Sequence, residues 1–166
     1  EPKPEQQNSG LNSLSFYYQN VRGLKTKLRS LHSSSYSFHY DVLFLTETWL
    51  DSNVLSSDVL CNEYHLYRND CSLLSSNKQR GGGVLIATKC SYVSCEISLP
   101  FTNVEMVCVK LIPKGFNIFL YCVYIPPNSS VMSFENCVKN IEFVINQSSN
   151  CDQHILCGDF NLPSVQ

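Results

Sequence analysis

The order of strand-like and helix-like segments constrains the fold of this chain more than any other feature. Eight short runs are apolar or alternate between apolar and polar residues, and Gly, Pro, Asn and Ser separate them. Their richness in β-branched and aromatic side chains predicts strands. The runs are Leu14–Asn20, Val42–Thr46, Tyr64–Arg68, Gly83–Thr88, Tyr92–Ile97, Val104–Leu111, Ile118–Tyr124 and His154–Gly158.

Two segments between these strands have helical spacing. The first covers about Leu24–Leu31 and is basic on its outer side. The second is expected to begin after Ser133 as N-cap. Its predicted apolar stripe consists of Phe134, Val138, Ile141 and Ile145. The order strand, helix, strand, then strands that can pair as hairpins, then helix and strand predicts a mixed α/β fold with helices outside the sheets.

The domain organisation follows from length and composition. With 166 residues, 43% of them hydrophobic, the chain can bury one core. Residues 1–13 are polar, so we expect a disordered lead-in followed by one domain over residues 14–166. A fold of this kind normally continues beyond a strand such as His154–Gly158, so we expect the chain to hold the larger, N-terminal part of its domain.

The nine cysteines do not have the spacing of a zinc site. Five of them lie within strand-like runs and are expected to be buried thiols: Cys90, Cys95, Cys108, Cys122 and Cys157. No apolar run approaches the roughly 20 residues that span a bilayer. We therefore expect no membrane partner and an intracellular protein, in the nucleus or the cytoplasm.

A net charge of −2 excludes nucleic-acid binding through a global basic field. Contacts with DNA would have to be local. One basic cluster contains Arg22, Lys25, Lys27 and Arg29, and a second contains Lys78 and Arg80. Each cluster taken alone is also typical of a solvated helix face or loop.

Polar side chains follow three predicted strands at their carboxyl ends. Asn20 closes the first run, Glu47 follows the second, and Asp159 and Asn161 follow the last. If the extended conformation persists, Asp159 and Asn161 point to the same side and Phe160 turns toward the core. In layered α/β proteins this edge is where sites are built.

Glu47 suits a hard divalent cation, since Mg²⁺ takes one or two protein carboxylates and keeps waters and phosphate oxygens as its other ligands. Plainer interpretations remain open for each residue. A Glu after a strand is often solvated, Gly-Asp-x-Asn is typical of an Asx turn, and Asn20 before Arg22 and Gly23 is compatible with an ordinary turn.

Five segments in this order resemble successive motifs of the endonuclease/exonuclease/phosphatase superfamily. They are Asn20–Leu24, Asp41–Thr48, Arg80–Val84, Val123–Asn128 and Leu156–Asn161. The Thr-Glu-Thr-Trp-Leu segment, the Arg-Gly-Gly-Gly run and the Tyr-x-Pro-Pro segment are most similar to the apurinic-type endonuclease domains of non-LTR retrotransposons. The resemblance implies an α/β fold, a four-layered α/β/β/α sandwich of two mixed β-sheets with outer helices.

The resemblance also implies roles for individual residues. Glu47 would be the main ligand of Mg²⁺, for which Mn²⁺ can substitute, with Asn20 close by on the metal and phosphate side. Tyr124 would direct its hydroxyl at the scissile phosphate. Asp159 would orient or deprotonate the attacking water, and Asn161 would hydrogen-bond the phosphate or Asp159. Arg22, Asn128 and Arg80 would contact DNA, and the doubled proline shifts Asn128 relative to the apurinic enzymes.

The expected function is a Mg²⁺-dependent endonuclease that nicks DNA, in a parent protein that carries a reverse transcriptase. The family closes with Ser-Asp-His, and none of the four histidines, His32, His39, His65 and His154, matches a family position. We therefore expect the 166-residue chain by itself to be inactive. Two alternatives stay open: a phosphatase of the same superfamily acting on lipid, inositol or nucleotide phosphates, and a catalytically dead retroelement remnant that acts as a binding module.

Overall fold

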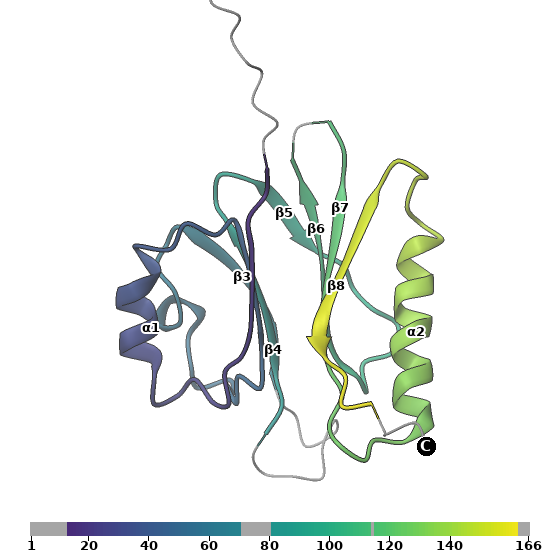
Figure 1. Cartoon of the computed structure of the whole chain (residues 1–166), viewed down its shortest axis with the longest axis horizontal. Coiled ribbons are helices and arrows are strands. Elements are labelled where there is room, and N and C mark those ends of the chain that lie inside the picture. The colour runs from purple at the N-terminus through teal and green to yellow at the C-terminus, as the bar shows by residue number, and fades with distance from the viewer. Residues whose placement is uncertain (1–12, 71–80, 114, 163–166) are drawn as a thin grey trace, which may run out of the picture.

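Two four-stranded sheets stand face to face between two helices (Figure 1). The computed structural model describes residues 13–70, 81–113 and 115–162. In the first sheet the strand order is β1 (Phe16–Asn20), β2 (Val42–Thr46), β4 (Val84–Lys89), β3 (Tyr64–Asn69). In the second it is β5 (Val93–Glu96), β6 (Glu105–Ile112), β7 (Ile118–Tyr124), β8 (Gln153–Asp159).

Helices cover the outer face of each sheet. Helix α1 (Leu28–Ser35) and the 3₁₀ turn η1 (Ser56–Asp58) lie on the first sheet, and α2 (Val131–Ile145) lies on the second (Figure 1). Both sheets are mixed, since β1 with β2 and β7 with β8 are parallel and the other neighbours are antiparallel. The predicted four-layered α/β/β/α sandwich is therefore confirmed.

The alternation of side chains along the strands creates three apolar layers. Val42 and Phe44 of β2 enter the layer between the sheets, whereas Leu43 and Leu45 pack toward α1. Strand β7 is buried along its whole length and divides its side chains between the inter-sheet layer and the layer under α2. Burial on both faces explains why these strands read as continuous apolar runs in the sequence.

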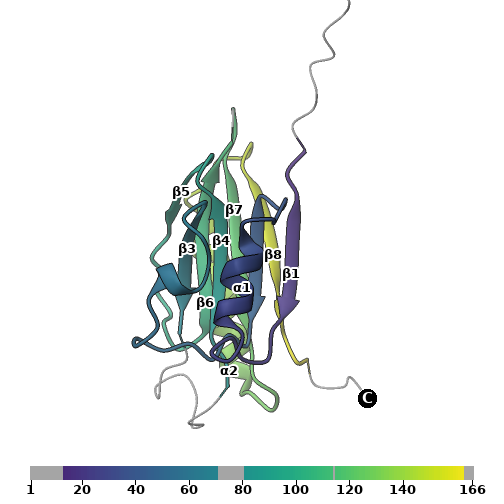
Figure 2. The same ribbon diagram turned by 90° about the vertical axis from the view of Figure 1, so that its left-hand side faces the viewer.

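The two parallel pairs bring the carboxyl ends of four strands together. Each pair is joined by a helical crossover, β1-α1-β2 and β7-α2-β8, as parallel neighbours require. The edge strands β1 and β8 lie side by side, each at the end of its own sheet (Figure 2). The register places Asn20 opposite Thr46 and Tyr124 opposite Asp159, so all four strands end at one edge of the sandwich.

The first helix begins later than its sequence pattern predicts. Helix α1 starts at Leu28, whereas the expected helix starts at Leu24. Leu24 is 2% exposed, and its amide donates to the carbonyl of Thr48 at 2.8 Å. This tertiary bond holds Leu24 alongside the segment after β2, which removes it from the helix.

The second helix differs from prediction in its start and its buried face. Its N-cap is Ser130, not Ser133. Phe134 and Ile141 of the predicted stripe are partly buried, but Val138 and Ile145 are exposed. The side chains buried instead are Asn136, Cys137, Asn140 and Val144. Asn140 turns inward because its amide group pairs with both the N–H and the C=O of Phe101, each at 3.0 Å.

Cysteine burial follows prediction in part. Cys108 and Cys122 are buried and Cys157 is partly buried, but Cys90 and Cys95 are exposed. Cys90 directly follows β4, and Cys95 lies on the edge strand β5, where only one neighbour covers the strand. In the described parts of the chain no helix is long and apolar enough to cross a membrane. The expected lead-in lies almost entirely outside the described residues.

Candidate active site

The inter-sheet layer becomes largely polar in its last row. Upstream of this row it contains Val42, Phe44, Leu120 and Cys122. In the last row of the first sheet, Asn20 lies opposite Thr46. In the last row of the second sheet, Glu105 lies opposite Tyr124, and Tyr124 opposite Asp159. Because directly paired residues present their side chains on the same face of a sheet, these five polar groups meet where the strands end.

Asn20 joins the two sheets through a pair of carboxylates. Its side-chain nitrogen donates to Glu47 Oε1 and to Asp159 Oδ2, both at 2.9 Å. Its side-chain oxygen accepts from the backbone N–H of Arg22 at 3.2 Å. The amide therefore orients two acidic groups, and hydrogen bonds to ionised acceptors are the stronger kind. The sequence predicted these three residues at strand ends, and the fold brings them into contact.

Glu47 sits in a strained turn. Its φ is +53°, a left-handed conformation that a non-glycine residue adopts only when its surroundings enforce it. The carbonyl of Glu47 accepts from the amide of Gly23 at 2.7 Å. On the other side, the amides of Thr48 and Trp49 donate to the carbonyls of Gly83 and Gly82 at 3.2 and 3.0 Å. The carboxylate thus projects from backbone that is held from both sides.

Tyr124 presents a hydroxyl that stays protonated. Burial, followed by the negative charges of Glu47, Glu105 and Asp159, raises the pKa of Tyr124 to about 12. The Tyr124 hydroxyl also hydrogen-bonds the carboxylate of Glu47. At neutral pH it is a neutral donor beside these three carboxylates.

The backbone does not stay extended from Asp159 to Asn161, which was the condition for their side chains to share a side. Strand β8 ends at Asp159, and Asn161 has a φ of +40°. Its side-chain nitrogen donates to the carbonyl of Ile125 at 3.1 Å, which ties the segment after β8 to the segment after β7. The extended conformation on which the expectation depended is therefore absent here. Phe160 packs into the layer under α2 as predicted.

The predicted DNA-contacting residues lie at different places. Arg22 is exposed and follows Asn20 by two positions, with a φ of +45°. Asn128 is exposed in the turn between β7 and α2, with a φ of +62°. Arg80 and Lys78 lie outside the described residues. In the first basic cluster, Lys25 pairs with Asp51 at 2.5 Å and Lys27 donates to the carbonyl of Val21 at 2.6 Å.

Glu105 was not predicted to belong to the site. It is 2% exposed, opens β6 and accepts from the amide of Gly83 at 2.5 Å. The sequence contained a signal for this. Alternate residues of a strand face the same side, so Glu105 had to face inward with Val107, Val109 and Leu111. An inward-facing acid in such a strand needs compensating partners.

The donor set fits a hard divalent cation. Glu47 and Asp159 converge on one amide, and Mg²⁺ takes one or two protein carboxylates while keeping waters and phosphate oxygens. Within the described ranges, no group of three or more His, Cys, Asp or Glu side chains forms a larger metal cluster.

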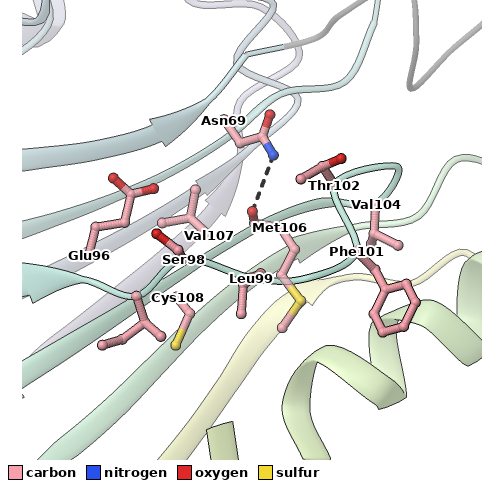
Figure 3. Close-up of a pocket in the computed structure, with 11 residues that line it drawn as sticks. Asn69, Glu96, Ser98, Leu99, Phe101, Thr102, Val104, Met106, Val107 and Cys108 are labelled. Atoms are coloured by element: carbon pink, nitrogen blue, oxygen red, sulfur yellow. Dashed lines mark hydrogen bonds between the residues drawn. The ribbon is translucent and has the colours of Figure 1, made fainter. Parts of the chain in front are cut away.

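A separate cavity of about 130 Å³ opens elsewhere on the second sheet (Figure 3). Asn69, Glu96, Met106 and Cys108 are among the residues that line it, and Asn69 donates to the carbonyl of Met106 at 3.3 Å. The lining includes none of the residues that meet at the strand ends, so this cavity is not part of the candidate site.

Residues 17–164 match the endonuclease/exonuclease/phosphatase family. The match covers most of the chain, and the chain therefore belongs to this family. Comparison with curated proteins gives no match.

Solved structures show the same fold. The endonuclease domain of TRAS1, a telomere-specific non-LTR retrotransposon, superposes with a TM-score of 0.64 at 13% identity, covering 92% of this chain and 61% of that domain. TDP2 from D. rerio in complex with a single-strand DNA product gives 0.53 at 20% identity, covering 91% and 62%. The human Nocturnin catalytic domain gives 0.51 at 19% identity, covering 79% and 55%. The chain thus spans less than two thirds of each of these three.

Proposed function

We propose that this chain carries the metal and water sites of a Mg²⁺-dependent phosphodiester hydrolase that nicks DNA. The observation that supports the proposal is the contact of one amide, Asn20, with the carboxylates of Glu47 and Asp159. Two acids held at one point supply a metal ligand and a proton acceptor, which are the two groups that hydrolysis of a phosphodiester requires.

Each residue of this group has a distinct task. Glu47 would hold the cation, with Asn20 orienting its carboxylate, and the bound cation would supply Lewis-acid stabilisation of the phosphate. Asp159 accepts a proton from the attacking water as the water oxygen bonds to phosphorus. The bond from phosphorus to the leaving sugar oxygen breaks, and that oxygen takes a proton from solvent. Tyr124, which stays neutral, would turn its hydroxyl hydrogen from the Glu47 carboxylate to the phosphate.

DNA is the proposed substrate for two reasons. Exposed Arg22 lies two residues from Asn20, where its side chain can contact a backbone phosphate without reading sequence. Similar folds occur in a retrotransposon endonuclease and in a protein crystallised with a DNA product. In such an element the freed 3′ end would prime a reverse transcriptase in the same parent protein.

The test is a supercoiled-plasmid nicking assay with Mg²⁺ or Mn²⁺. It uses the 166-residue chain and any longer chain that its gene encodes, here called the extended chain. We expect nicking by the extended chain and none by the 166 residues alone. Glu47→Gln keeps the side-chain volume but removes the anionic ligand, so it should abolish nicking in the extended chain. Nicking at the wild-type rate by that variant would remove Glu47 from the site.

Asp159→Asn separates chemistry from binding. The water loses its proton acceptor while contacts with the phosphate persist, so single-turnover cleavage should fall by about 10²-fold or more with little change in DNA affinity. Equal losses of binding and turnover would show that Asp159 is structural. Release of phosphate from nucleotides or inositol phosphates, without plasmid nicking, would favour a phosphatase instead.

A further inference from the structure

The buried acid Glu105 lies opposite Tyr124 in the last row of the second sheet, and Tyr124 lies opposite Asp159. Glu105 is 2% exposed, and its carboxylate accepts a hydrogen bond from the amide of Gly83. Burying an ionised carboxylate is unfavourable unless polar partners stabilise it. A hydrophobic residue would fill this position in the inter-sheet layer without that requirement, so the acid must serve a contact that an apolar side chain cannot make.

That contact fixes the backbone of Gly82 and Gly83. A Cβ atom at Gly82 would lie 2.2 Å from Glu105 Oε2, so the carboxylate occupies the space where any other residue would place its side chain. Gly82 also has a φ of +77°, which glycine adopts without strain. The Glu105 carboxylate therefore packs directly against the backbone of Gly82 and Gly83, where a side chain at position 82 would not fit.

The same two glycines hold the turn that presents Glu47. The carbonyl of Gly83 accepts from the amide of Thr48 at 3.2 Å, and the carbonyl of Gly82 accepts from the amide of Trp49 at 3.0 Å. These are the two residues directly after Glu47, whose φ of +53° is unfavourable without such support. Hydrogen bonds thus link Glu105 to Gly83, and link Gly83 and Gly82 to Thr48 and Trp49, the two residues that directly follow Glu47.

We infer that Glu105 is a positioning residue of the metal site: it fixes the Gly82–Gly83 backbone, which in turn holds the left-handed turn that aims the Glu47 carboxylate. The inference rests on the proposed function, because it assumes that Glu47 binds the cation. Glu105 does not touch the cation or the substrate in this scheme. Replacing Glu105 should therefore weaken metal binding because the Glu47 carboxylate is no longer held in its orientation.

The test measures Mn²⁺ binding by the 166-residue chain, with electron paramagnetic resonance as the readout, beside urea unfolding. Glu105→Leu keeps the bulk and removes the acceptor, and we expect it to weaken Mn²⁺ binding about tenfold. Glu105→Gln retains an oxygen for the amide of Gly83 and should recover part of the affinity. Val107→Ala is the matched control: it is buried on the same face of β6, so it should lower stability but leave Mn²⁺ affinity within about twofold.

Gly82→Ala disturbs the same contact from the other side, because the added methyl group collides with the carboxylate. It should weaken Mn²⁺ binding to a similar degree, and it decides the question if Glu105→Leu does not fold. Amide hydrogen exchange at Thr48 and Trp49 should accelerate in both variants and not in Val107→Ala. Wild-type Mn²⁺ affinity in folded Glu105→Leu or Gly82→Ala would overturn the inference.

Glu47→Gln separates this outcome from failure of the proposed function. If Glu47→Gln abolishes Mn²⁺ binding while the Glu105 and Gly82 variants bind normally, the metal site stands and the positioning role is wrong. If the wild-type chain does not bind Mn²⁺, or Glu47→Gln binds it equally well, the proposed metal site is wrong and the positioning role falls with it.

Discussion

Replacing Gly158 with Ala should separate strands β7 and β8 immediately before the acid of the proposed site. Gly158 pairs with Val123, a fully buried residue of a central strand. A Cβ atom at Gly158 would lie 2.1 Å from the carbonyl oxygen of Val123 and 3.0 Å from its carbonyl carbon. The obstacle is backbone in the middle of the sheet, which cannot rotate aside as a flexible side chain would.

The magnitude follows from the displacement that this collision requires. The strands must move apart by about 1 Å, which lengthens the neighbouring N–H···O contacts beyond hydrogen-bonding range. Overpacking of a core typically costs about 1–3 kcal/mol, and each lost hydrogen bond about 1 kcal/mol. We expect Gly158→Ala to lower the free energy of unfolding by about 2–4 kcal/mol. It should also weaken the contact between Asn20 and Asp159, because Asp159 moves with β8.

The assay is urea unfolding followed by far-ultraviolet circular dichroism, with Gly115→Ala as control. Gly115 has a φ of +95° and no atom within 4 Å of an added Cβ, so alanine there costs only the strain of a left-handed residue, about 1–2 kcal/mol. Gly158→Ala should exceed it and should also weaken Mn²⁺ binding. A loss of stability no larger than that of Gly115→Ala would show that strands β7 and β8 accommodate the methyl group without moving apart.

Three further predictions concern titration, the site and the core. Burial raises the pKa of Tyr64 to about 12, so the stability that its neutral form contributes is complete below pH 10 and is lost as the pH rises toward 12. In urea unfolding, the free energy of unfolding of the wild type should therefore fall more steeply above pH 10 than that of Tyr64→Phe. Equal slopes would contradict this. In the extended chain, Asn20→Ala should reduce single-turnover cleavage by about 10²-fold because Glu47 and Asp159 lose their shared donor, whereas unchanged cleavage would remove Asn20 from the site. Leu120→Ala, at a fully buried inter-sheet position, should lower the free energy of unfolding by about 2–5 kcal/mol, and a loss below 1 kcal/mol would show that the two sheets repack around it.

Local pattern determined the strands and their order. Strands β2 and β7 have the bounds that their apolar runs predict, because every residue in them is buried and turn residues limit both ends. The placement of Glu47 and Asp159 directly beyond or at strand ends was also readable from the sequence. The strand bounds and the polar residues at the strand ends depend only on residues that are close in the chain, so one sequence is enough to predict them.

The tertiary structure decided the features that depend on distant partners. Helix α2 turns Asn140 inward because the backbone of Phe101 satisfies its amide, and Asn161 leaves the extended conformation to reach the carbonyl of Ile125. Asn20 and Asp159, which are 139 positions apart, meet only because the parallel pairs end at one edge of the sandwich. Hydrogen-bond partners that are distant in the chain leave little trace in local composition. The sequence therefore indicated Glu47 and Asp159, but only the fold shows that Asn20 donates to both carboxylates.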